Sequence, residues 1–262
     1  MRQIMYPRQI IAVTTAKTHV RSYLWIWRVL FACSFFLLLL APFLRLSPAH
    51  ALRGIVLKGH PYFSTGFESG DPQPTWRSTG DSGVYPAGGV YNVGSICCKL
   101  KGPEMTVRRE WAHQGSAALL YSGYDRSPND SYAYMKVFDT TNRQLIIDQD
   151  TELDYWIYPQ SAASNIARAR GLVRGSNSAC VAVDLLFSNG SNLRDASMRD
   201  QSGNYIHPSW QCNHLKLDTW NYVEVDLGFL QGRQITRIDV GYDQAAHIGG
   251  YRGYIDALAI HD

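Results

Sequence analysis

The chain has 262 residues and a formal net charge of +3, but its basic and acidic residues are unevenly placed. No acidic residue precedes Glu68, whereas residues 1–51 contain six basic ones. Without that segment the formal charge is −3, which argues against nucleic acid as a partner of the rest of the chain.

The N-terminal segment has the three parts of a secretory signal. A basic stretch ends at Arg28, the apolar run VLFACSFFLLLLAPFL covers residues 29–44, and Ala49-His50-Ala51 supplies a small-residue cleavage site. A membrane span needs about 20 apolar residues, so this shorter run favours cleavage after Ala51 over a retained helical anchor. In both cases the basic flank stays in the cytoplasm, and we expect a secreted or cell-surface, extracytoplasmic protein.

The exported part is expected to form one domain, because roughly 200 residues without repeats or a low-complexity break fit a single domain. We divide the chain into a signal peptide or anchor (1–51), a linker (52–62) and a domain (63–262).

Four cysteines follow the signal segment: Cys97, Cys98, Cys180 and Cys212. Disulfides persist in exported proteins, so we expect one or two bridges. A bridge between the neighbours Cys97 and Cys98 is sterically awkward, and we therefore expect Cys180 and Cys212 to pair with them, in an order that the sequence does not choose. The cysteines lack the C-x-x-C spacing of a zinc site.

Period-two patterns rich in β-branched and aromatic residues dominate the domain and predict strands. In YVEVDL, for example, Val223, Val225 and Leu227 face one way while Glu224 and Asp226 face the other, as in an antiparallel sheet with one buried face. The strands are expected at residues 132–138, 153–159, 180–187, 222–228 and 235–242. This pattern predicts an all-β fold, an antiparallel β-sandwich of the jelly-roll type.

Three segments are too long for simple hairpin turns, namely residues 69–103, 160–179 and 188–214. Long loops in compact domains are usually functional, and the third concentrates polar and aromatic groups suited to sugar recognition. Together with residues near the C-terminus, it supplies the candidate ligand-binding side chains Arg194, Asp195, Asp200, His207, Trp210, Tyr242, Asp243, Tyr251 and Arg252. Trp156 and Trp220 are expected in the core, and His207 is expected to fix the loop.

Two acidic residues at opposite ends of the domain suggest a metal site. Alternation in YRGYIDALAIHD places Tyr254, Asp256, Leu258 and Ile260 on one face, where an unpaired carboxylate is costly. Glu68 follows Phe67 near the first strand, which in sandwiches commonly lies beside the last. Carboxylates brought together with backbone carbonyls suit Ca²⁺, so we expect Glu68 and Asp256 to bind a structural calcium with help from Asp71. The alternative is that Asp256 pairs with Arg252 and that Glu68 is solvated.

Three short motifs resemble the galactose-binding-like jelly rolls of carbohydrate-binding modules appended to bacterial secreted glycosidases, including α-mannosidases. The motifs are FESG at residues 67–70, AHQGSAAL at residues 112–119 and YID at residues 254–256, and the resemblance covers nearly all of residues 63–262. It implies that the opening acid, carbonyls near the second motif and the closing Asp256 hold the calcium. Gln114 departs from a usual Ser, and Ala257 replaces the second Asp of the closing motif.

The favoured function is a secreted, non-catalytic carbohydrate-binding module that recognises a glycan through loop residues and carries structural Ca²⁺. The first alternative is a small jelly-roll glycosidase or polysaccharide lyase, because Asp148, Asp150, Glu152 and Asp154 recur at every second residue. Four like charges in a row repel each other, so we expect a turn near Asp150 to break this row. The second alternative is an adhesion domain tethered to the membrane by an uncleaved N-terminus.

Overall fold

The computed structural model describes residues 61–76, 87–96, 102–161, 175–245 and 247–262, all within the compact unit Gly54–Asp262. The predicted signal segment, most of the linker, Cys97 and Cys98 lie outside the described residues. No helix within the described ranges is long and apolar enough to cross a membrane.

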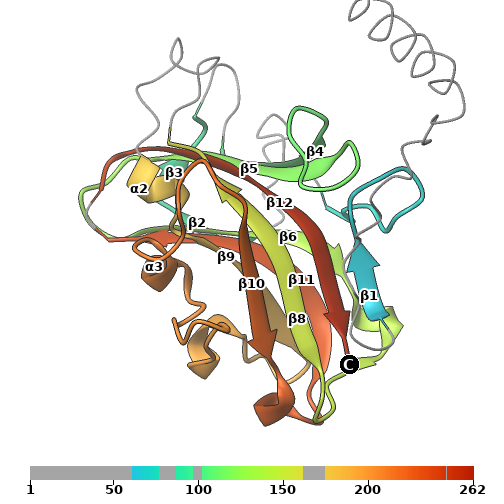
Figure 1. Cartoon of the computed structure of the whole chain (residues 1–262). Coiled ribbons are helices and arrows are strands. Elements are labelled where there is room, and N and C mark those ends of the chain that lie inside the picture. The colour runs from blue at the N-terminus through green and yellow to red at the C-terminus, as the bar shows by residue number, and fades with distance from the viewer. Residues whose placement is uncertain (1–60, 77–86, 97–101, 162–174, 246) are drawn as a thin grey trace, which may run out of the picture. The chain divides into compact units, whose positions relative to one another are not determined.

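The domain consists of two antiparallel sheets packed face to face (Figure 1). The seven-stranded sheet runs in the order β10-β8-β12-β5-β3, with β1 beside β12 and β4 beside β5. Its strands are β1 (Pro61–Thr65), β3 (Val93–Gly94), β4 (Glu104–Arg108), β5 (Ala118–Asp125), β8 (Glu152–Pro159), β10 (Asn221–Asp226) and β12 (Gly249–His261).

The five-stranded sheet runs in the order β2-β6-β11-β7, with β9 also paired to β11. Its strands are β2 (Ala87–Tyr91), β6 (Ser131–Asp139), β7 (Leu145–Ile146), β9 (Val181–Phe187) and β11 (Gln234–Gln244). Short helical turns connect the strands: η1 (Thr141–Arg143), α2 (Gly175–Ser178), η2 (Arg194–Ala196), α3 (Pro208–Gln211) and η3 (Gly228–Leu230). The predicted all-β antiparallel sandwich is confirmed.

The core lies between the sheets and is built from one face of each strand. In β8, Leu153, Tyr155 and Ile157 are at most 1% exposed, while the intervening residues point outward. Val223 and Val225 of β10 are buried in the same way, as their alternation predicts. Each fully buried apolar side chain contributes about 1.5–3 kcal/mol of transfer free energy, so this shared inner face is the main source of stability.

The first and last strands are neighbours, as expected. β1 pairs antiparallel with β12, with Phe63 opposite Ile260 and Thr65 opposite Leu258. Glu68 itself lies in the turn after β1. The chain therefore brings the FESG turn next to the C-terminal strand.

The simple alternation predicted for the C-terminal strand is wrong, because β12 contains a bulge. The pairing with β8 shifts between Asp256 and Ala259, and Ala257 has a φ of 51°. An extra residue of this kind reverses the facing of the residues that follow it. As a result Ile255, Leu258 and Ile260 all belong to the core, while Tyr254 faces outward and packs with Ala118 and Leu120.

The expected cysteine pairing is also wrong. Cys180 and Cys212 are bonded to each other across a sequence separation of 32 residues. Cys180 directly precedes β9 and Cys212 directly follows α3, so the bridge fastens the 188–214 loop to the end of the five-stranded sheet.

Candidate functional site

A row of tyrosines crosses the outer face of the five-stranded sheet. Tyr91 of β2 stands opposite Tyr132 of β6, whose other neighbour is Asp243 of β11. The rings of Tyr91 and Tyr132 are 5.6 Å apart at an interplanar angle of 29°, and Tyr134 follows at 6.0 Å from Tyr132. Tyr91 is 52% exposed and Tyr132 is half-buried. These two rings form an accessible aromatic surface, which we call the tyrosine face.

Glycine allows the innermost ring to lie against the sheet. Gly241 of β11 stands opposite Tyr134, and a Cβ at this position would lie only 2.5 Å from the Tyr134 ring. The ring therefore fills the place that a side chain of β11 would take. The guanidinium of Arg194 lies 3.8 Å from the centre of the same ring, as a cation–π contact.

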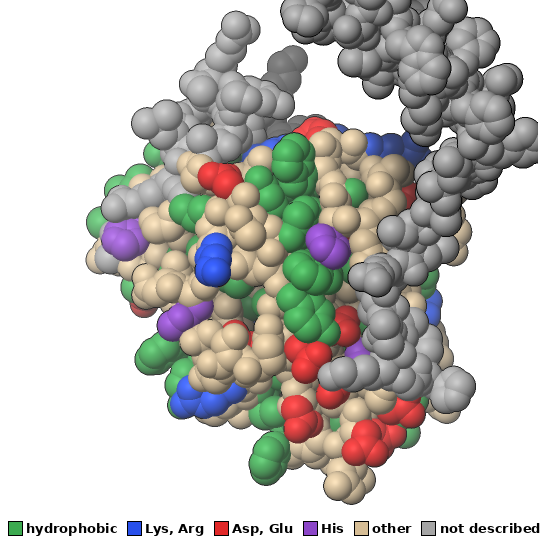
Figure 2. Space-filling view, in the orientation of Figure 1, with side chains coloured by type: hydrophobic (Ala, Val, Ile, Leu, Met, Phe, Trp, Pro, Cys, Tyr) green, Lys and Arg blue, Asp and Glu red, His purple; other side chains and the backbone are tan. Residues whose placement is uncertain are grey.

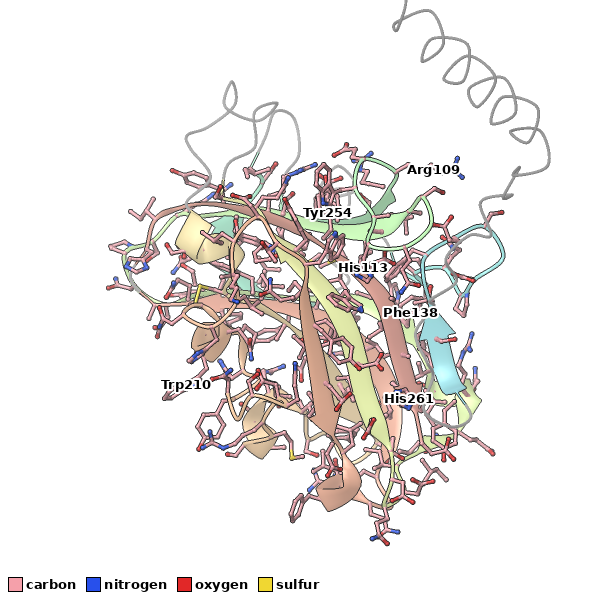
Figure 3. The ribbon with its side chains drawn as sticks, in the orientation of Figure 1. Arg109, His113, Phe138, Trp210, Tyr254 and His261 are labelled. Atoms are coloured by element: carbon pink, nitrogen blue, oxygen red, sulfur yellow. A yellow bond between two sulfur atoms is a disulfide. The ribbon has the colours of Figure 1, made fainter. Side chains whose placement is uncertain are left out.

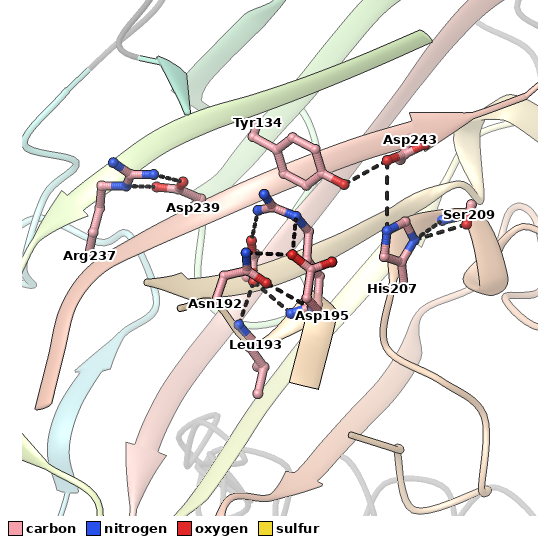
Figure 4. A network of polar contacts seen from close by, with 11 residues as sticks. Tyr134, Asn192, Leu193, Asp195, His207, Ser209, Arg237, Asp239 and Asp243 are labelled. Atoms are coloured by element: carbon pink, nitrogen blue, oxygen red, sulfur yellow. Dashed lines mark hydrogen bonds and ion pairs between the residues drawn. The ribbon is translucent and has the colours of Figure 1, made fainter. Parts of the chain in front are cut away.

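A polar network borders the tyrosine face (Figure 4). The Tyr134 hydroxyl donates to Oδ2 of Asp243 at 2.7 Å, and Nε2 of His207 lies 3.8 Å from the same oxygen. Arg194 forms an ion pair with the buried carboxylate of Asp184. Burial raises the pKa of Asp243, while the Tyr134 hydroxyl and the nearby His207 and Arg194 act in the opposite direction. Asp243 is therefore a hydrogen-bond acceptor held in a fixed orientation beside the rings.

The 188–214 loop is held in place by its own polar contacts. His207 caps α3, because its Nδ1 accepts the Ser209 amide at 3.3 Å and Pro208 occupies the first turn. Asp200 accepts the amides of Ser202 and Asn204, each at 2.9 Å. With the disulfide, these contacts position Arg194 and His207 over the outer face.

The structure brings three of the predicted ligand-binding residues together at the tyrosine face: Arg194, His207 and Asp243. Asp195 is exposed and accepts a hydrogen bond from Asn192 at 2.7 Å. Trp210 is 57% exposed and packs against Tyr205 at 5.3 Å between ring centres (Figure 3). Asp200 holds a turn.

The other three predicted residues lie elsewhere. Tyr242 and Tyr251 are 2% and 3% exposed and stack on each other in the core at 3.9 Å, so they present no open ring to a ligand. They occupy inward-facing strand positions, and the Tyr242 hydroxyl donates to buried Asp125. Arg252 lies on the other sheet, where it contacts Glu110 and Gln160.

The sequence reasoning missed the tyrosine face itself. The signal was present in YAYMKVF, where Tyr132 and Tyr134 alternate with Ala133, Met135 and Val137. A strand that buries Ala, Met and Val on one face must present its tyrosines on the other. The expected placement of Trp156 and Trp220 in the core is likewise wrong, since both are partly exposed on the outer face of the seven-stranded sheet.

The turn predicted within the acidic row is confirmed. Asp148 accepts the amide of Asp150 at 3.1 Å and the hydroxyl of Thr151 at 2.9 Å, and β8 begins only at Glu152. Asp148 and Asp150 are therefore not part of the strand that carries Glu152 and Asp154, and the four carboxylates do not form one row.

Glu68 and Asp256 meet on one loop, the segment between β4 and β5. Oε1 of Glu68 accepts the amides of Ser116 at 2.5 Å and Ala117 at 2.7 Å. Oδ2 of Asp256 accepts the amides of His113 and Gln114 at 2.7 and 2.9 Å. Residues near the beginning and the end of the domain thus form hydrogen bonds with the same segment, AHQGSA.

Asp71 completes this acidic group. Its Oδ2 and Oδ1 of Asp256 both lie within 4 Å of the point that a Cβ at Gly66 would occupy. Burial raises the pKa of Asp256 to about 6, and the charge of Glu68 acts in the same direction. Arg252 pairs with Glu110, so the alternative in which it neutralises Asp256 is wrong.

The donor set fits a hard divalent cation in charge and in ligand type. A carboxylate has about four acceptor positions, and Glu68 and Asp256 each use three for hydrogen bonds. The described part of the chain contains no group of three or more His, Cys, Asp or Glu side chains already arranged around a metal position. Binding would therefore draw on the spare carboxylate positions together with backbone carbonyls.

Distantly similar folds occur in several proteins that bind or cleave carbohydrates. No protein-family model and no curated protein sequence matches the chain. A carbohydrate-binding module of the β-sandwich superfamily aligns with 79% of the chain and 64% of its own length, at 14% identity and a TM-score of 0.41.

Two further solved structures align to a similar extent. The Endo-D glycoside hydrolase domain from Streptococcus pneumoniae R6 aligns with 76% of the chain and 27% of its own length, at 15% identity and a TM-score of 0.44. The CBM22-1 xylan-binding domain of Xyn10C from Paenibacillus barcinonensis aligns with 78% of the chain and 94% of its own length, at 14% identity and a TM-score of 0.34. The chain thus spans less than two thirds of the first two structures.

Proposed function

We propose that this domain is a non-catalytic carbohydrate-binding module and that the tyrosine face holds the glycan. The observation that carries the proposal is that the exposed Tyr91 ring, the half-buried Tyr132 ring and the oriented carboxylate of Asp243 lie together on one outer face. An aromatic ring offers an apolar face to the C–H groups of a sugar, and a fixed polar group beside it binds the hydroxyls.

The polar groups around the rings include both acceptors and donors for the hydroxyl groups of a sugar. Asp243 accepts hydrogen bonds, whereas the guanidinium of Arg194 donates them and is 23% exposed. His207 stands beside Asp243 with 25% of its side chain exposed. The arrangement supplies binding and orientation, which is the function of a binding module. We further propose the galactose-binding-like type and an association with a secreted glycosidase, on the motif resemblance alone.

The tyrosine face is tested by electrophoresis through gels that contain soluble arabinoxylan, galactomannan or mixed-linkage β-glucan. We expect at least one polysaccharide to retard the wild-type domain, and Tyr91→Ala combined with Tyr132→Ala to weaken that binding about tenfold or more, a loss of about 1.4 kcal/mol. Phe229→Ala is the matched control, because Phe229 is 91% exposed and lies on η3, outside the tyrosine face. Equal retardation of the double variant and the wild type would contradict the proposal.

We also propose that Glu68, Asp71 and Asp256 bind a structural Ca²⁺. The support is that oxygens of Asp71 and Asp256 both lie near Gly66 and that Glu68 binds the same loop as Asp256, which is 0% exposed. When bound, the ion neutralises these charges and links the FESG turn to β12.

Thermal unfolding tests the proposed calcium site. We expect millimolar Ca²⁺ to raise the Tm of the EDTA-treated wild type, because a ligand that binds only the folded state stabilises it. Asp256→Asn should unfold at lower temperature and show no response to Ca²⁺. Equal Tm values for the wild type in Ca²⁺ and in EDTA would remove the calcium proposal while leaving the tyrosine face untouched.

We propose that the protein works outside the cytoplasm. The disulfide between Cys180 and Cys212 supports an oxidising compartment, where such bonds persist. Mass spectrometry of the protein recovered from culture medium should find an N-terminus at Leu52, whereas an intact residue 29–44 segment in a membrane fraction would favour the tethered form.

A further inference from the structure

A second aromatic surface crosses the outer face of the seven-stranded sheet (Figure 2). In this view hydrophobic side chains form a band down the face, with a histidine beside it and acidic side chains below. The band contains a continuous series of ring contacts, which we call the aromatic track, and its members are Trp111, Tyr158, Trp220, His113, Trp156 and Tyr222.

The strands place these rings by alternation. Trp156 and Tyr158 of β8 lie between the buried residues Tyr155, Ile157 and Pro159, so they face outward. Tyr222 of β10 stands opposite Trp156, and Trp220 directly precedes β10. The track is therefore a product of two neighbouring strands, to which the loop before β5 adds Trp111 and His113.

The ring contacts are continuous from one end to the other. Trp111 lies 5.4 Å from Tyr158, and Tyr158 lies 5.4 Å from Trp220. His113 then lies 5.4 Å from Trp220 and stacks on Trp156 at 3.9 Å, and Trp156 lies 5.2 Å from Tyr222. Trp111 is 47% exposed and the other members are partly exposed. An elongated apolar surface results, where an outer sheet face ordinarily carries polar residues.

Hydrogen-bonding groups stand at both ends of the track. At the Trp111 end, Glu110 accepts the Tyr254 hydroxyl at 2.8 Å and pairs with Arg252. At the other end, the Tyr222 hydroxyl lies 2.9 Å from Glu224 and 3.2 Å from Asp154. The charge of Glu110 is balanced by Arg252, whereas the carboxylates of Glu224 and Asp154 at the Tyr222 end disfavour an anionic ligand such as a polyuronate.

We propose that the aromatic track is a second glycan-binding surface, for an extended and uncharged polysaccharide. The occupant follows from the shape and chemistry of the surface: a line of rings offers repeated stacking positions, and the polar groups at its ends can bind hydroxyls. This inference rests on the proposed function and extends it to a domain that binds two chains.

The two surfaces lie on opposite sides of the sandwich, because each is the outer face of one of the two packed sheets. One molecule therefore holds two chains, or two segments of one chain, at once. Two such sites increase the overall affinity for a long polysaccharide through effective concentration, and they allow the domain to crosslink polysaccharide chains.

The experiment compares single-surface variants in gels that contain arabinoxylan, galactomannan, mixed-linkage β-glucan or polygalacturonate. The track variant is Trp111→Ala with Trp220→Ala, the tyrosine-face variant is Tyr91→Ala with Tyr132→Ala, and Phe229→Ala is the control. We expect each surface variant to keep partial retardation by the same neutral polysaccharide, and the combined variant to lose it. Light scattering should show crosslinked particles with the wild type and with neither surface variant.

Thermal unfolding and circular dichroism verify that each variant is folded, and Trp111→Ala alone serves if the partly buried Trp220 proves necessary for folding. Retardation and crosslinking that do not change in the track variant would overturn this inference and leave the tyrosine face intact. Retardation by polygalacturonate alone would overturn it too, because the proposed ligand is uncharged. Failure of every polysaccharide to retard the wild type would instead remove both proposals.

Discussion

Asp243 is held by a partly buried hydrogen bond within the protein itself. The Tyr134 hydroxyl fixes one carboxylate oxygen at 2.7 Å, and Tyr134 is itself held between Gly241 and the guanidinium of Arg194. Fixing the carboxylate before binding reduces the entropy lost when a ligand arrives. The carboxylate of Asp243 is therefore preorganised for the proposed ligand.

The same environment predicts that glycan binding weakens in acid. Burial raises the pKa of Asp243, so the carboxylate gains its proton at a higher pH than an ordinary aspartate. The ionised form is the stronger acceptor, so binding is fully present above this raised pKa and weakens as the pH falls through it. Titration calorimetry from pH 7 to pH 4 should show this loss. The Asp243→Asn variant should bind glycan more weakly and should lack the loss of affinity that protonation of Asp243 causes. An identical pH profile of affinity in both proteins would contradict a role for the Asp243 carboxylate in binding.

Gly115 provides a residue-scale test of the contacts around Glu68. It has a φ of 65°, and a Cβ there would lie 2.4 Å from Oε1 of Glu68. Gly190 is the matched control, because its φ of 82° is also positive but its surroundings are open. We expect Gly190→Ala to cost about 1 kcal/mol in the free energy of unfolding. Gly115→Ala should cost about 1 kcal/mol more, because Glu68 must move and lose its hydrogen bonds with Ser116 and Ala117. Equal losses in urea denaturation would show that Glu68 does not occupy this position.

At the scale of elements, the disulfide and α3 hold the 188–214 loop over the sheet. Replacing Cys180 and Cys212 by serine removes a link that closes a loop of 32 residues, and the free energy of unfolding should fall by about 3 kcal/mol. Glycan affinity should fall as well, since His207 and Arg194 lie on this loop. The serine variant therefore needs measurement at a temperature where it is fully folded. Unchanged affinity there would mean that the loop is positioned without the bridge.

Much of the element pattern was predictable, because alternation is a local property of the chain. The segments YAYMKVF and YVEVDL lie on β6 and β10 with the facing that their alternation predicts for the apolar residues. The bulge at Ala257 was not predictable, since nothing in YIDALAI distinguishes a bulged strand from a regular one. It is fixed by the hydrogen bonds of Asp256 with a loop more than 140 residues earlier in the chain.

The candidate site was predicted only in part for a related reason. Arg194 and His207 belong to a long polar loop and Asp243 to a strand end, and the three residues converge as predicted. Tyr242 and Tyr251 are aromatic residues predicted to contact a ligand, but both face the core. Which face of a strand is buried depends on the opposite sheet, and a single strand sequence with apolar residues on both faces does not reveal it.

At the scale of the whole molecule, the sandwich places its apolar core and its exposed aromatic rings on opposite faces of each sheet. The inner faces of the sheets carry the apolar core, while each outer face carries accessible aromatic rings with polar groups beside them. The carboxylates of Glu68 and Asp256 join the first turn and the last strand to one loop.

The most direct test of the central claim is to map a bound glycan by NMR on the isotope-labelled domain, residues 52–262. Oligosaccharides from the polysaccharide that retards the wild type are titrated in, and amide chemical shifts are followed. The account predicts saturable shifts at Tyr91, Tyr132 and Asp243 on the outer face of the five-stranded sheet. Saturable binding that leaves these three amides unshifted would contradict it.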